Sequence, residues 1–182
     1  MPDTFKREND LRVVKTRRAL YDALTALLRR SHFSKITVYD ICARALVSRT
    51  AFYAHFKDKY DLLEHMLQPL RERLVDLFFK EDDKALEDYV CTKYTRYAGL
   101  VANVLEDTSM DMFLVLFHFF APPSEAFRNS PGTRLMVQSY VAGGIYSALL
   151  LQTRRHGRED AELRERIACA CRLIRTHQDF IV

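Results

Sequence analysis

The stretch that decides the fold spans residues 36–59 and reads ITVYDICARALVSRTAFYAHFKDK. Its first part predicts a short helix at about residues 38–44, with Ile41 and Ala45 facing inward. Thr37 is a good N-terminal cap for this helix, because its hydroxyl can accept a hydrogen bond from a backbone N–H of the first turn. Asp40, three positions later, completes the sequence signature of a capping box.

The second part of the stretch predicts a tight turn at Leu46-Val47 and a second short helix, capped by Ser48, over residues 49–56. Phe52 and Phe56 lie four positions apart and face inward. The opposite face carries Arg49, Thr50, Tyr53 and His55. A short exposed helix with these side chains, braced by a preceding helix, is suited to reading bases in the major groove of DNA.

These residues resemble the DNA-binding segment of the TetR family of transcriptional regulators, which typically reads T-v-x-x-I-a-x-x-A-G-v-s-x-g-t-l-Y-x-h-F-x-x-K-x-x-L. The positions in register are Thr37, Val38, Ile41, Ala45, Val47, Ser48, Tyr53, His55, Phe56, Lys59 and Leu62. With the preceding helix, the resemblance covers about residues 13–67. One departure is Leu46, which stands where the family usually has a turn glycine, so the turn is either strained or reshaped.

The resemblance implies a DNA interface with two kinds of contact. We assign Arg49 and Thr50 to base edges, since they begin the second helix. The residues assigned to phosphates are Thr37, Ser48, Tyr53, His55 and Lys59.

Composition and charge favour an all-α protein with two parts. The chain has 182 residues, 48% of them hydrophobic, and only five glycines and five prolines. Residues 1–65 hold 13 Lys and Arg against 8 Asp and Glu, a net charge of +5, whereas the remainder has a net charge of −1. The excess of positive charge therefore lies with the helix-turn-helix, as a DNA partner requires. We expect a DNA-binding domain at residues 1–57 and a helical regulatory and dimerisation domain at residues 58–182.

Helical periodicity outlines the rest of the chain. Residues 1–11 are expected to form a loose arm. The predicted helices lie at about residues 13–30, 58–79, 85–105, 110–120, 133–153 and 159–177. Pro69 predicts a kink or a break in the helix that joins the two domains.

Aromatic residues are frequent after residue 77 and can either line a small-molecule cavity or form packed core. His118, within the run FLVLFHFFAPP, is either a core histidine or one that faces a ligand. Family resemblance, rather than spacing, favours a cavity among the central helices. The candidate ligand-binding residues are Phe78, Tyr94, Tyr97, Phe113, Phe117, His118 and Tyr140.

The last two predicted helices carry complementary faces. The first has a groove of small residues and the second an apolar ridge, and in the TetR family the last two long helices usually pack as a four-helix dimer interface. The alternative is a seam within one subunit. The candidate interface residues are Ser139, Gly143, Ser147, Leu163, Ile167, Cys171 and Ile174.

Other classes of function find little support. The sequence has no phosphate-binding glycine loop and no nucleophile elbow, so we expect no enzyme and no cofactor. The four cysteines have no metal-ligand spacing, so no metal is expected. No signal peptide, lipidation motif or long apolar run occurs, which predicts a soluble, cytoplasmic protein without membrane contact.

The sequence therefore predicts a homodimeric transcriptional regulator that binds a double-stranded DNA operator. We expect a repressor that an unknown small-molecule effector releases from its operator. The alternative is a co-regulator, or interaction protein, that acts through its C-terminal helices with little DNA binding of its own. The outward chemistry of residues 49–59 favours the first of these.

Overall fold

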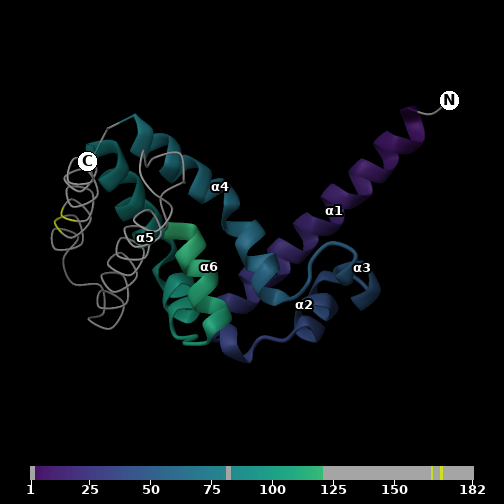
Figure 1. Cartoon of the computed structure of the whole chain (residues 1–182). Helices are drawn as coiled ribbons and strands as arrows, with labels where there is room; N and C mark the ends of the chain where they lie inside the picture. Colours follow the sequence, from purple (N-terminus) through teal and green to yellow (C-terminus); the bar gives the residue numbers. More distant parts are fainter. Residues whose placement is uncertain (1–2, 81–82, 121–164, 166–168, 170–182) are drawn as a thin grey trace.

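The computed structural model describes residues 3–80 and 83–120, together with Glu165 and Cys169. Helices and turns make up this part of the chain, which confirms the all-α prediction (Figure 1). The elements are α1 (Asp3–Leu28), the 3-10 turn η1 (Phe33–Lys35), α2 (Val38–Ala45), α3 (Arg49–Tyr53), α4 (Lys59–Phe79), α5 (Asp83–Leu105) and α6 (Met110–Phe120). The helix predicted at residues 133–153 lies outside the described residues, and so does the one at residues 159–177 apart from Glu165 and Cys169. All of the candidate dimer-interface residues also lie outside the described residues.

The first helix is longer than predicted. The expected loose arm at residues 1–11 is wrong from Asp3 onward, because α1 begins there, and its N-terminal turns extend away from the other helices (Figure 1). Residues 3–12 contain no glycine or proline. Extending a helix that has already nucleated adds one hydrogen bond for each residue fixed, so these residues continue the helix at little cost.

The joining helix α4 continues through Pro69, so of the predicted kink or break the break does not occur. Proline has no N–H, so the carbonyl of His65 loses its helical partner there. The neighbouring helix α5 contains an interruption that the sequence did not predict: Tyr97 has non-helical backbone angles (φ −119°, ψ 17°).

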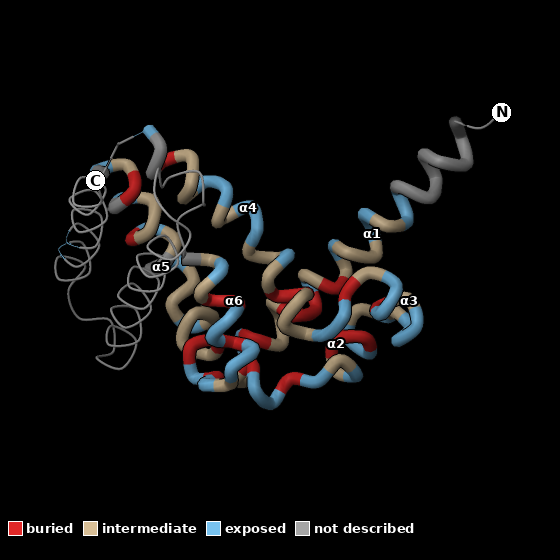
Figure 2. The backbone as a smooth tube through the Cα atoms, viewed as in Figure 1, coloured by how far each residue is buried: buried red, intermediate tan, exposed pale blue. Residues whose placement is uncertain are grey.

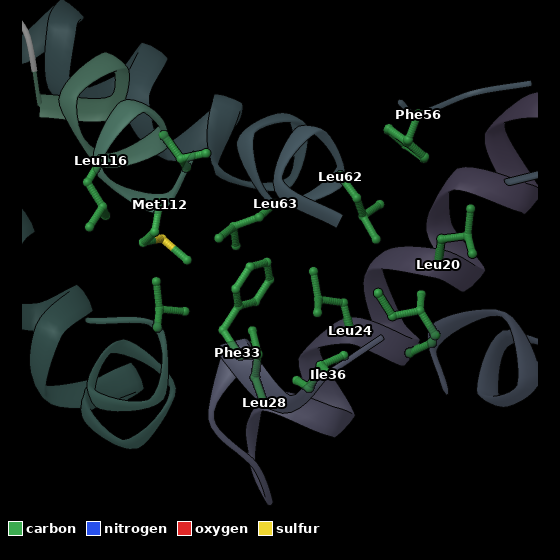
Figure 3. Close-up of a cluster of buried hydrophobic side chains, with 14 of the residues drawn as sticks. Leu20, Leu24, Leu28, Phe33, Ile36, Phe56, Leu62, Leu63, Met112 and Leu116 are labelled. Carbon is green, nitrogen blue, oxygen red and sulfur yellow. The ribbon is translucent and has the colours of Figure 1, made fainter. Parts of the chain in front are cut away.

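One hydrophobic core joins the helices (Figure 2). It is built from the second half of α1, η1, α2, α3, both ends of α4, positions along α5 and one face of α6. In Figure 3, Phe33 lies among Leu24 and Leu28 of α1 and Leu63 of α4, with Met112 of α6 close by. The core therefore continues across the boundary that we predicted between residues 57 and 58. The division into two domains stays a prediction.

Candidate nucleic-acid interface

The start of α2 has the cap that its sequence predicts. The backbone N–H of Asp40 donates to Thr37 Oγ1 (3.2 Å), and the backbone N–H of Thr37 donates to Asp40 Oδ2 (2.9 Å). The Thr37 hydroxyl also donates to Asp40 Oδ2 (2.6 Å). These bonds, the hydroxyl first and the backbone N–H second, hold the pKa of the Asp40 carboxyl below its usual value. The capping box is thus confirmed, and it uses the hydroxyl hydrogen that we assigned to a phosphate.

The turn after α2 is closed by two backbone hydrogen bonds. Val47 N donates to Cys42 O (3.1 Å), and Leu46 N donates to Ala43 O (3.4 Å), the pattern of a Schellman motif. Leu46 adopts the left-handed conformation (φ 55°, ψ 38°) that glycine normally provides in this motif. Its side chain is 94% exposed. The turn therefore has the geometry that a glycine normally provides, with backbone strain at Leu46.

Helix α3 is short and firmly anchored. Ser48 Oγ accepts a hydrogen bond from Ala51 N (3.1 Å), which confirms Ser48 as the cap and leaves its hydroxyl hydrogen for another acceptor. The helix ends at Tyr53, one turn before the predicted end at Phe56. Phe56 still lies inside, because Phe56 N donates to Phe52 O (2.9 Å) and the two buried rings are 5.8 Å apart. The helix ends early because the chain turns at residues 54–58 to enter α4.

The outward face of α3 presents the side chains that we assigned to DNA. Arg49 and Thr50 are exposed, and Tyr53 is 50% exposed. The Arg49 guanidinium carbon lies 5.9 Å from the centre of the Tyr53 ring, within the range of a cation–π contact. Such a contact restrains a long flexible side chain. His55, just beyond the helix, is half-buried.

Lys59 has a structural role that the sequence did not predict. Its ammonium has three N–H donors, and they bond to the carbonyls of Phe33 (2.9 Å), Ser34 (3.2 Å) and Ile36 (3.0 Å). Burial lowers the pKa of this ammonium, while the carboxylates of Asp107 and Asp58 act in the opposite direction. Lys59 therefore ties the first turn of α4 to η1, and its three N–H donors are used within the chain. Its contact with a phosphate stays a prediction.

Two basic residues beside the recognition helix were absent from our prediction. Arg44, in the last turn of α2, and Lys57, between α3 and α4, are both exposed. Neither makes an ion pair within the part of the chain that the structure describes. The excess positive charge of residues 1–65 was the signal that could have identified them, since it exceeds what the assigned residues carry.

The candidate ligand-binding residues are only partly placed. The side chains of Phe78 and Tyr94, and the whole of Tyr140, lie outside the described part. Phe113 is 51% exposed and stacks on the half-buried Phe117, with 6.1 Å between ring centres. His118 lies at the surface, where its Nδ1 is 3.1 Å from Glu64 Oε1. Phe117 and Tyr97 are thus the half-buried members, and the cavity stays a prediction.

Comparison with known proteins agrees with this geometry. Residues 20–66, which include η1, α2, α3 and the beginning of α4, match the sequence profile described as bacterial regulatory proteins, tetR family. This segment of the chain is therefore of the TetR family. This family is one of regulatory proteins and not of enzymes.

Proteins similar to this chain include the uncharacterized HTH-type transcriptional regulator YxbF of Bacillus subtilis (strain 168). The two sequences are 35% identical over 72 residues, and the match covers 39% of this chain and 19% of YxbF. The chain thus spans about a fifth of that relative's length.

Solved structures extend the likeness of fold to most of the chain. A TetR transcriptional regulator from Streptococcus agalactiae 2603V matches with a TM-score of 0.61 at 20% identity, over 93% of this chain and 98% of the other. A putative TetR-family transcriptional regulator from Syntrophomonas wolfei str. Goettingen matches with a TM-score of 0.54 at 16% identity, over 90% and 95%. Identities this low establish the fold alone.

Two further observations concern only the described residues. No three His, Cys, Asp or Glu side chains there converge in the way a metal ion requires. None of the helices there is long and apolar enough to cross a lipid bilayer.

Proposed function

We propose that this TetR-family chain is a homodimeric regulator of transcription that binds an operator through α3. The outward face of α3 is the observation that carries this proposal. A capped helix whose buried side is anchored by Phe52 and Phe56 presents Arg49, Thr50 and Tyr53 to the outside. Such a helix can enter a major groove while its anchors keep it rigid.

Base readout falls to the first turn of α3. Arg49 can donate two hydrogen bonds to a guanine, and Thr50 can contact either a base or a thymine methyl group. Ser48, Tyr53 and His55 hold phosphates, and the free hydroxyl hydrogen of Ser48 supports its part in this. Arg44 and Lys57 join this set in place of Lys59, whereas Thr37 contributes mainly through its backbone position at the start of α2.

Dimerisation places two copies of α3 on one DNA face. Two recognition helices enter successive major grooves when they lie about 34–36 Å apart, so a two-fold dimer reads a near-palindromic site. The interface in this proposal is formed by the small-residue groove around Gly143 and the apolar ridge around Ile167. A monomer would make half of the contacts and bind weakly.

An effector acts on the dimer by changing the separation of the two α3 helices. Helix α4 joins the DNA-binding end to the aromatic cluster around Phe117, and α6 packs beside it. A small apolar molecule seated against Phe117 and Tyr97 would displace α6 and tilt α4. To move the population from mostly bound to mostly released, the effector must favour the released state by about 5 kcal/mol.

Selection of bound fragments from sheared genomic DNA tests the proposal. The purified full-length chain should enrich a small set of near-palindromic sites, and Arg49→Ala should bind them more weakly and with relaxed base preference. Arg73→Ala is the matched control, because Arg73 is an exposed arginine on α4 beyond Pro69, far along the helix from α3 (Figure 1). A reporter gene placed behind a selected site then tells repression from activation.

The alternative function, a co-regulator acting through its C-terminal helices, predicts a different result. Enrichment would then be absent for the wild type, or equal for the wild type and Arg49→Ala. Either outcome would remove α3 from the mechanism.

A further inference from the structure

Asp107 is the one buried polar or charged residue within the described part of the chain, at 5% exposure. It lies in the turn between α5 and α6, far in sequence from the helix-turn-helix. Its Oδ1 accepts a hydrogen bond from the backbone N–H of Ser109 (2.9 Å), and its Oδ2 accepts one from the Tyr60 hydroxyl (3.2 Å). A buried carboxylate needs such partners, because burying it without them would be very unfavourable. Tyr60, in the first turn of α4, is therefore part of what keeps Asp107 inside.

Ser109 connects this pair to the start of α6. Its Oγ accepts a hydrogen bond from Met112 N (3.2 Å), and its carbonyl accepts one from Phe113 N (3.0 Å), so Ser109 is the N-terminal cap of α6. The same Oγ donates to the Tyr60 hydroxyl oxygen (3.2 Å). The hydroxyl of Tyr60 is thus held by both the cap of α6 and the carboxylate that precedes it.

The other side of Tyr60 leads to the helix-turn-helix. Its ring meets Phe33 of η1 edge-on, with 5.2 Å between ring centres. The preceding residue, Lys59, bonds to three carbonyls of η1 and the residues beside it, the last of them Ile36. Ile36 directly precedes Thr37, the cap of α2. A series of hydrogen bonds, joined by the neighbouring chain positions 59–60 and 36–37, therefore runs from the first residue before α6 to the first residue before α2.

A second set of contacts joins the same two regions. Asn103 Nδ2, near the end of α5, donates to the carbonyl of Leu28 at the end of α1 (2.7 Å). His32 Nδ1, just before η1, lies 3.2 Å from Glu106 Oε2. Figure 3 shows the apolar side of this junction, where Phe33, Leu63 and Met112 lie close together. The α5–α6 turn is therefore attached to the DNA-binding end at several points.

We propose that Asp107, Ser109 and Tyr60 are positioning residues for DNA binding. Through their contacts, the start of α2 moves when the start of α6 moves. A displacement of α6 would pull on Tyr60, and the adjacent Lys59 would carry that displacement to η1 and to Thr37. Burial raises the pKa of the Tyr60 hydroxyl, so it stays protonated and able to donate. The importance of these contacts for regulation rests on the proposed function, but the coupling between the start of α6 and the start of α2 does not.

Three variants test the series without disturbing apolar packing. Tyr60→Phe removes only the hydroxyl, Asp107→Asn keeps the shape of the side chain and removes its charge, and Ser109→Ala removes the cap. Tyr89→Phe and Asp111→Asn are the matched controls. Tyr89 is half-buried on α5 and its hydroxyl makes no hydrogen bond to a described residue, and Asp111 is exposed in the first turn of α6.

Amide hydrogen exchange of the full-length chain, without DNA, is the primary measurement. In each test variant, exchange at residues 33–40 should quicken about 2- to 12-fold, the range that loss of one hydrogen bond allows, while residues 14–24 of α1 stay unchanged. Tyr60→Phe combined with Asp107→Asn should have little more effect than Tyr60→Phe alone, because both changes act on the same contact. The two controls should leave residues 33–40 as they are in the wild type.

Two results would overturn the proposal. Faster exchange confined to residues 105–112 would mean that changes in the α5–α6 turn do not affect η1. An equal increase throughout α1–α6 would mean that these contacts only contribute to the stability of the whole core. The fragment selection remains a separate test: a wild type that selects no DNA removes the proposed function, yet exchange at residues 33–40 still decides the mechanical coupling. Where DNA is selected, the three variants should lower affinity for it by the same factor on all selected sites, unlike Arg49→Ala.

Discussion

Replacing Leu46 by glycine should stabilise the protein, although glycine usually weakens a fold. Leu46 is the single non-glycine residue with positive φ in the described part of the chain (φ 55°). Its side chain is 94% exposed, so the substitution removes almost no buried apolar surface. The backbone bonds of the turn, from Leu46 N and Val47 N, do not involve the side chain and would be kept.

The magnitude follows from two opposing effects. A left-handed conformation costs an L-residue roughly 1–2 kcal/mol, and glycine avoids this cost because it has no Cβ. Glycine also gives the unfolded chain more freedom, which lowers the stability of the folded state by about 0.5–1 kcal/mol. The net result is a gain of about 0–1.5 kcal/mol in the free energy of unfolding. Asparagine tolerates the left-handed region with less freedom in the unfolded state, so Leu46→Asn should be comparable or slightly better.

Urea denaturation measured by far-UV circular dichroism gives the sign of the change in the free energy of unfolding. In Leu46→Gly the midpoint urea concentration should rise while the dependence of the free energy on urea stays the same. Leu114→Gly is the control: Leu114 is exposed (45%) in the middle of α6, where the same substitution should cost about 1 kcal/mol or slightly more. A loss of stability in Leu46→Gly comparable to that of Leu114→Gly would refute the argument. It would mean that the turn is not strained, or that the Leu46 side chain makes a stabilising contact.

Three further predictions concern the DNA-binding end and the dimer. Lys59→Met should lower the free energy of unfolding by about 1.5–3 kcal/mol, because three carbonyls lose a charged donor. The same variant should leave the salt dependence of DNA binding unaltered. A fall of about 0.9 in the slope of log binding constant against log salt concentration would instead show that Lys59 contacts a phosphate. The pKa of Asp40 is lowered in the folded state, so its stabilising effect is present above its unfolded pKa near 3.8 and is lost as the pH falls through the folded pKa. Asp40→Asn should therefore lose less stability than the wild type on going from about pH 4 to lower pH, and parallel acid melting curves would contradict this. Gly143→Leu should sediment as a monomer and bind a selected operator far more weakly, whereas a dimeric variant with normal affinity would place the interface elsewhere.

The features that sequence alone determined are those whose partners lie within a few residues. The capping box at Thr37 and Asp40 spans three positions, and the Ser48 cap also spans three. The family resemblance pointed to Leu46, where a glycine is usual, as either a strained or a reshaped turn, and the structure has the left-handed conformation there. Periodicity placed α5 and α6 to within two residues and identified Phe52 and Phe56 as buried. Local hydrogen bonds and the 3.6-residue repeat depend only on residues that are close in the sequence, so they can be predicted without knowing the fold.

Tertiary structure decided everything that depends on residues distant in the chain. Lys59 looked like an exposed basic residue beside the recognition helix, but the carbonyls that hold it are 23 to 26 positions earlier. Asp107 looked like an ordinary turn residue, and only the packing of α4 against the α5–α6 turn brings the Tyr60 hydroxyl to it, 47 positions away. Each of these outcomes depends on which surfaces the core brings together, and that depends on the packing of all the helices at once rather than on any one segment.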